Sequence, residues 1–163
     1  MDTPIDRIRN YFKAFEDRVD NYVSHKNDLE KCKDLCESAY EGLYKLKERV
    51  YTEFTNRQGS NLTKPQITLL EKMFKDEFLI GLLKIRNAAT HIIIDKNHKA
   101  DDITLYTTSN EQFTLDCKTS AGALFSKNIF TTKDNKSGAN KIDHAGFLTE
   151  AVKRLRKKIN ALT

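Results

Sequence analysis

The chain contains few residues of the kinds that interrupt regular structure: 6 glycines and 2 prolines among 163 residues, and no tryptophan. This scarcity excludes collagen-like and low-complexity classes and favours long helices. The cysteine count is three, and an odd number argues against a disulfide framework and favours a reducing compartment, for which we predict the cytoplasm. The sequence has no run long enough for a membrane span and no signal-peptide core, so we expect no membrane partner.

Apolar and charged residues are both plentiful, at 39% and 31% of the chain. Together with the length, this composition predicts one domain spanning residues 1–163 around a single core. The formal net charge of +5 fits a polyanionic partner such as RNA, although many ordinary domains carry a similar excess. Cys32 and Cys36 have only His25 nearby, which is too few ligands for zinc, so we predict no metal and no cofactor.

The hydrophobic periodicity predicts a mainly α fold, an up-and-down bundle of about four helices with a small β-hairpin inserted near 103–117. A capping box at Thr3 and Asp6 opens the first helix, whose apolar stripe runs to Tyr22. The pattern breaks at residues 24–28, and a second helix runs from Leu29 to about Thr55. One continuous bent helix is the alternative. A second capping box at 63–66 opens a helix reaching about residue 94, and the last helix spans about 143–161.

The helix that ends near residue 94 combines an apolar surround with a cluster of reactive side chains. Arg86 is followed directly by Asn87, and His91 follows five residues after the arginine. Histidine exchanges protons near neutral pH, and arginine neutralises charge on phosphate oxygens. RNA carries its own nucleophile in the 2′-hydroxyl, so these residue types suit metal-independent RNA cleavage. The alternative is that His91 is a satisfied interface histidine.

The segment Arg86-Asn87-Ala88-Ala89-Thr90-His91 resembles the motif of the HEPN superfamily, an arginine, usually a polar residue, and a histidine after a gap of four to six. The resemblance implies a helical bundle and a dimeric, metal-independent endoribonuclease with a composite site. It also implies that Arg86 and His91 are catalytic and Asn87 supports them. A toxin–antitoxin or antiviral defence setting, with an antitoxin or defence-system partner protein, is expected on the same grounds. Ile93 stands where HEPN toxins paired with nucleotidyltransferases usually carry tyrosine, which argues against that branch.

Basic residues outside the motif are candidates for holding RNA phosphates. The alternative is a solvated basic face whose cations suit a helix C-terminus. The predicted set consists of Lys84, Lys153, Arg154, Arg156 and Lys157.

The helical period places Arg86 and His91 about 140° apart on one helix. One copy would therefore hold them loosely, whereas two copies facing each other could bring both pairs into one cleft. We predict a symmetric homodimer along a second apolar stripe. The predicted interface is Ile80, Leu83, Asn87, His91 and Ile94.

Two other functions fit the same residues. One is a catalytically inactive HEPN-like module that binds RNA or a nucleotide and dimerises. The other is a helical interaction protein in which the motif is accidental. The intact Arg86, Asn87 and His91 favour the enzyme.

Overall fold

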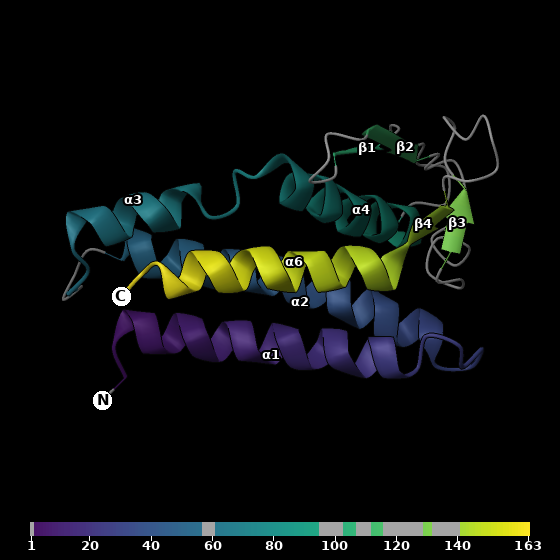
Figure 1. Ribbon diagram of the computed structural model, residues 1–163, viewed down its shortest axis with the longest axis horizontal. Helices are drawn as coiled ribbons and strands as arrows, with labels where there is room; N and C mark the ends of the chain where they lie inside the picture. Colours follow the sequence, from purple (N-terminus) through teal and green to yellow (C-terminus); the bar gives the residue numbers. More distant parts are fainter. Residues whose placement is uncertain (1, 57–60, 95–102, 107–111, 116–128, 132–140) are drawn as a thin grey trace.

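The computed structural model describes residues 2–56, 61–94, 103–106, 112–115, 129–131 and 141–163. The side chains of 88–94, 103–106, 112–115, 129–131, 141 and 142 are not included in that description. The described part is mainly helical. Its long helices lie side by side, and the chain runs back and forth along the bundle in alternating directions (Figure 1). The two chain ends lie together at one end of the bundle, and the strands gather at the other.

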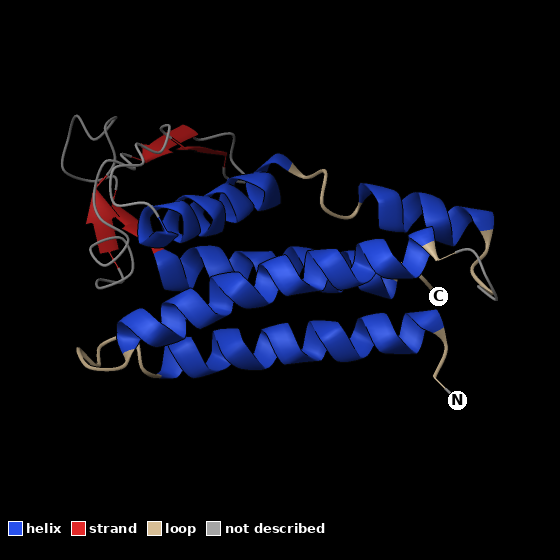
Figure 2. Cartoon of the chain, turned by 180° about the vertical axis from the view of Figure 1, so that it is seen from behind, coloured by secondary structure: helices blue, strands red, loops and turns tan. Residues whose placement is uncertain are grey.

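Helices α1 (Pro4–Ser24) and α2 (Cys32–Thr55) form an antiparallel pair, joined at the end of the bundle far from the termini (Figure 2). The predicted capping box is confirmed, since the Thr3 hydroxyl accepts from the Asp6 N–H at 3.1 Å and the Asp6 carboxylate accepts from the Thr3 N–H at 3.0 Å. The alternative of one bent helix is wrong. Asp28 accepts from two successive N–H groups in the connection, and α2 begins at Cys32 rather than at Leu29, which is 89% exposed.

The expected single helix from residue 64 to 94 is two helices, α3 (Lys64–Lys72) and α4 (Glu77–Ile94). Its start and its end agree with the sequence, and the Thr63–Gln66 capping box is present. The break occurs because side chains satisfy the backbone groups of a helix end. Asp76 accepts from the Phe78 N–H at 2.8 Å, and Lys158 donates to the Met73 carbonyl at 2.8 Å. The Asp76 contact is local and the Lys158 contact is tertiary. Both are polar, so the spacing of apolar residues in the sequence does not reveal them.

Helix α6 (His144–Asn160) is the last helix of the bundle, and its bounds are close to the predicted range of about 143–161. Asp143 caps it by accepting from the Gly146 N–H at 3.1 Å. Apolar residues that recur every three or four positions along α6 and just after it are buried: Leu148, Val152, Leu155, Ile159 and Leu162.

Four short strands are described. β1 (Ile103–Tyr106) pairs antiparallel with β2 (Gln112–Leu115), with Ile103 opposite Leu115, in the segment for which the sequence predicts a hairpin. β3 (Ile129–Thr131) pairs antiparallel with β4 (Lys141–Asp143), which leads into α6. Residues 107–111, between β1 and β2, and residues 132–140, between β3 and β4, lie outside the described residues.

One hydrophobic cluster joins the five described helices, and α2 contacts all four others. The second apolar stripe predicted on α4 does not face outward as a whole. Ile80 is 37% exposed, but Leu83 is buried at 6% exposure, like its neighbours Leu82 and Ile85. Leu83 therefore belongs to the hydrophobic core of the chain. Among the described residues, no helix combines the length and the apolar character that crossing a membrane requires.

Candidate functional site

Arg86 lies on α4 and reaches across to α2, where it forms a two-point ion pair with Glu41. Its Nε donates to Glu41 Oε2 at 2.8 Å, and its Nη2 donates to Oε1 at 3.1 Å. The guanidinium carbon also lies 3.7 Å from the centroid of the Tyr44 ring, one turn further along α2. A planar cation held by a carboxylate and an aromatic face has little rotational freedom. The predicted catalytic arginine is thus fixed in one orientation.

Asn87 follows Arg86 on the exposed side of α4. Its Oδ1 accepts from Arg86 Nη1 at 3.1 Å, so the guanidinium contacts the predicted supporting residue directly. The Arg86 side chain is 18% exposed and that of Glu41 is 34% exposed, which places the pair at the edge of the core. The structure therefore brings together two of the three predicted catalytic residues, with an additional carboxylate beside them.

The ion pair stays charged over a wide pH range. The hydrogen bond from Arg86 lowers the pKa of the Glu41 carboxyl in spite of its partial burial. The same bond raises the pKa of Arg86. The Tyr44 hydroxyl, hydrogen-bonded to Glu48, has a raised pKa and stays protonated at neutral pH. Glu41 and Tyr44 escape sequence analysis because they are ordinary helix residues more than 40 positions from Arg86, and no local pattern marks a tertiary partner.

His91 lies on the same helix, whose backbone is regular through Ile94. The helical period places it on the side of Asn87 and about 140° from Arg86. Its side chain is outside the described part of the structure, and so are those of its neighbours from 88 to 94. Lys84, predicted to bind RNA, is exposed on the preceding turn.

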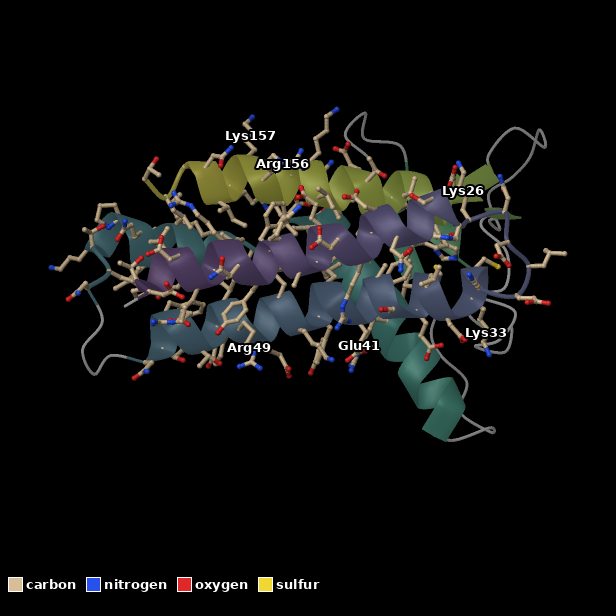
Figure 3. All side chains as sticks on the ribbon, turned by 90° about the horizontal axis from the view of Figure 1, so that it is seen from below. Lys26, Lys33, Glu41, Arg49, Arg156 and Lys157 are labelled. Atoms are coloured by element: carbon tan, nitrogen blue, oxygen red, sulfur yellow. The ribbon has the colours of Figure 1, made fainter. Side chains whose placement is uncertain are left out.

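The basic residues predicted on α6 divide into two groups. Lys153 and Lys157 are exposed. Arg154 instead lies in an internal network, where it contacts both oxygens of Asp76 at 2.9 Å and Glu150 at 3.1 Å. Arg156 forms an ion pair with Glu16 of α1. Figure 3 shows Arg156 and Lys157 on α6 and Glu41 on α2, on opposite sides of α1.

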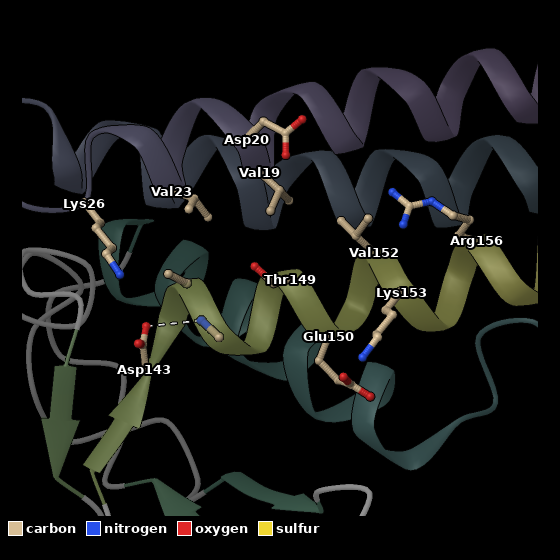
Figure 4. A pocket seen from close by; sticks show the side chains of 12 residues that line it. Val19, Asp20, Val23, Lys26, Asp143, Thr149, Glu150, Val152, Lys153 and Arg156 are labelled. Atoms are coloured by element: carbon tan, nitrogen blue, oxygen red, sulfur yellow. Dashed lines mark hydrogen bonds between the residues drawn. The ribbon is translucent and has the colours of Figure 1, made fainter.

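A groove of about 530 Å³ runs between α1 and α6, next to the start of α6 (Figure 4). Lys153 and Arg156 line it together with Lys26, which the sequence analysis did not single out because it lies in a connecting turn. Three carboxylates line the same groove, those of Asp20, Asp143 and Glu150. Cations and carboxylates are therefore equal in number here, and the groove is not a basic surface.

A buried polar cluster lies where α1, α2 and α6 meet, and sequence analysis missed it. The Tyr40 hydroxyl and His144 Nδ1 are 2.7 Å apart, and neither side chain is more than 1% exposed. Burial raises the pKa of Tyr40 and of the Cys36 thiol, which keeps both neutral. Full burial of both side chains indicates a structural role.

Metal binding finds no support in the described residues, where no group of three or more His, Cys, Asp or Glu side chains could hold an ion. Cys32 and Cys36 are buried free thiols. His25 is turned towards its own helix, with Nδ1 2.8 Å from the Asn21 carbonyl oxygen.

Comparison of the chain with known protein families, with curated proteins and with solved structures finds no match.

Proposed function

We propose that the protein is a metal-independent endoribonuclease of the HEPN type, acting as a homodimer in a toxin–antitoxin or antiviral defence role. One observation carries the proposal: Arg86 is held by Glu41 and Tyr44, with Asn87 bonded to its outer nitrogen, on a helix whose next turn carries His91. An arginine fixed before substrate arrives loses less entropy on binding a phosphate and stabilises developing charge more effectively.

The reaction needs only groups that this motif supplies. The ribose 2′-oxygen attacks the adjacent phosphorus, a bond forms between them, and the bond from phosphorus to the 5′-oxygen breaks. One imidazole takes the proton from the 2′-hydroxyl, and the protonated imidazole of the second copy gives a proton to the departing 5′-oxygen. Arg86 neutralises the extra negative charge on the phosphate oxygens in the transition state. The products are a 2′,3′-cyclic phosphate and a 5′-hydroxyl.

The test of the chemistry is RNA degradation by the purified protein in EDTA, with the product ends identified by mass spectrometry. Wild-type protein should give 2′,3′-cyclic phosphate ends. His91→Ala should cleave roughly 10²–10⁴-fold more slowly, while His25→Ala, an exchange of the same type at a half-exposed turn residue, should retain wild-type activity. Products with 5′-phosphate ends, formed only with added Mg²⁺, would exclude the mechanism.

The dimer proposed here uses a face of α4 that differs at one position from the face predicted from the sequence. Leu83 leaves the interface because it is buried in the chain's own core, and a charge at that position would disrupt the core rather than the dimer. Exposed Lys84 takes its place, because it lies four residues after Ile80 and three before Asn87. The proposed face consists of Ile80, Lys84, Asn87, His91 and Ile94.

Ile80→Glu tests this assembly, because Ile80 is an exposed apolar residue at the start of the face. We expect monomers by sedimentation and a loss of cleavage. Leu69→Glu is the matched control, since Leu69 is exposed to a similar degree on α3 and lies outside the face. An active wild-type monomer at assay concentration would contradict the composite site.

The second candidate is the catalytically inactive module that binds RNA or a nucleotide. The observation that favours it is the Glu41 carboxylate, which already neutralises Arg86. The assay in EDTA separates the two candidates, because an inactive module binds RNA and leaves it intact.

A further inference from the structure

Gly42 lies inside α2, where a glycine costs about 0.5–1 kcal/mol relative to alanine. Its lack of a side chain allows α1 to pack closely against α2. A Cβ at this position would lie 2.9 Å from Cδ of Arg18 and 3.4 Å from the Phe15 ring, on α1. The missing methyl group therefore lets the Arg18 stem lie directly on the surface of α2.

The guanidinium of Arg18 lies against α2 about one helical turn before Glu41. Its Nη1 donates to the Ser38 carbonyl at 3.1 Å, and Ser38 and Glu41 are three residues apart on one face of the helix. The positive charges of Arg86, Lys45 and Arg18 all act to lower the pKa of Glu41. Positive charges from three helices thus act on one carboxylate.

Helix stability does not require the Arg18 contact. A carbonyl inside an α-helix already accepts from the N–H four residues on, and Ser38 is not among the last residues of α2. An interior glycine that admits an arginine to such a carbonyl weakens the helix. The arrangement does have an electrostatic consequence. Arg86, Lys45 and Arg18 act on Glu41, whereas Glu41 and Glu48 are the carboxylates that act on Arg86, so one positive charge of this group is left over.

We infer that Arg18 is a second phosphate-binding arginine of the Arg86 site, holding a phosphate of the RNA strand next to the one that is cleaved. The inference rests on the proposed ribonuclease function and deepens it. Arginine suits this role because its planar fork matches phosphate oxygens. Arg18 binds and positions RNA, whereas Arg86 acts on the reacting phosphate.

The experiment measures binding of a fluorescein-labelled single-stranded RNA oligonucleotide by fluorescence anisotropy, in the His91→Ala background so that the probe is not cleaved. Adding Arg18→Gln should weaken binding about fivefold near 0.1 M salt and reduce the slope of log Kd against log salt by about 0.7, the value for one phosphate contact on a single strand. Arg9→Gln, on an exposed arginine of the same helix, should change neither quantity.

Arg18→Lys provides a second measurement if the glutamine variant does not fold. It keeps the charge, so the salt slope should stay at the wild-type value while the affinity falls through loss of the fork. In the active protein, Arg18→Gln should raise KM and leave kcat within about twofold, the pattern of lost ground-state binding.

Two results would overturn the inference in distinguishable ways. If the wild type cleaves RNA and both Arg18 variants bind like Arg9→Gln, Arg18 has no role and the proposed function stands. If the wild type cleaves no RNA and the His91→Ala protein binds none, the proposed function and the inference both fail.

Discussion

Two arginines of this protein form similar contacts in different places. Arg86 pairs with Glu41 and stacks on Tyr44, while Arg154 pairs with Asp76 and stacks on Phe78, with its guanidinium carbon 4.5 Å from the ring centroid. The two side chains are almost equally exposed, at 18% and 19%. The two ion pairs therefore differ in the other contacts that their carboxylates, Glu41 and Asp76, make.

Asp76, the partner of Arg154, makes several structural contacts. Asp76 caps α4 through the Phe78 N–H and also contacts Lys158, which in turn satisfies the end of α3. The partner of Arg86 has a different place, since Glu41 lies within α2 and its ion pair with Arg86 joins α2 to α4, two helices that the core already holds together. An ion pair that stabilises the break between two helices is expected to support the stability of the fold. An ion pair that only orients an arginine beside the exposed Asn87 is more typical of a functional site.

The largest effect should separate the two arginines by activity. Arg86→Gln should reduce RNA cleavage by roughly 10²–10³-fold, because the transition state loses a fixed positive charge. Arg154→Gln should leave the rate of the folded protein within about threefold. Rates in EDTA, measured on protein checked by circular dichroism, decide the matter. A greater loss with Arg154→Gln would reverse the assignment of the two pairs.

The next effect should separate them by stability. Arg154→Gln leaves the Asp76 carboxylate, 17% exposed, without its main partner and should cost about 2 kcal/mol of unfolding free energy. Arg86→Gln should cost less than about 1 kcal/mol, because Glu41 can turn towards solvent. Urea denaturation of the two variants provides the comparison. Equal losses would show that both pairs are structural.

A smaller effect should appear in the dependence of stability on pH. Burial alone would raise the pKa of Asp76, but the hydrogen bond from Arg154 and the charges of Lys158 and Arg154 lower it. A carboxyl with a lowered folded-state pKa contributes its full stability above about pH 5 and loses it as the pH falls through that pKa. Asp76→Asn should therefore flatten the decline in acid.

Urea denaturation at a series of pH values between neutral and about pH 3 measures this decline. Glu41→Gln is the matched control. The pKa of Glu41 is also lowered, but its side chain is twice as exposed as that of Asp76, so we expect less flattening. An Asp76→Asn protein with the wild-type decline would show that Asp76 is not an acid-sensitive contact.

Much of the fold follows from the sequence because local signals define it. The capping boxes at Thr3 and Thr63 mark two helix starts correctly, and apolar spacing marks the buried stripes of α1 and α6. The break between α3 and α4 was missed, since Lys158 and Arg154 from the far end of the chain help to hold it. Apolar spacing also could not show that Leu83 faces inward, because both sides of α4 carry apolar residues.

The candidate site is predictable only in part for a similar reason. Arg86 and Asn87 are visible in the sequence as a motif and lie in contact. No motif marks Glu41 or Tyr44. Only the packing of α1 and α4 against α2 brings Arg18 and Arg86 to this part of α2. The sequence predicts that Arg154 binds RNA, but its side chain is bound to Asp76, a partner 78 residues away that no local pattern indicates.

The smallest effect concerns the ring beneath Arg86. Tyr44→Leu removes the aromatic face but keeps an apolar side chain, and a cation–π contact of this kind contributes about 0.5–1 kcal/mol. A double-mutant cycle with Arg86→Gln should return a coupling of that size in urea denaturation, because each single change removes the same contact. If the ring also fixes the guanidinium for catalysis, Tyr44→Leu should lower kcat more than it changes KM. A coupling near zero would mean that Glu41 alone orients Arg86, and the comparison between the two arginines would then rest on their carboxylates.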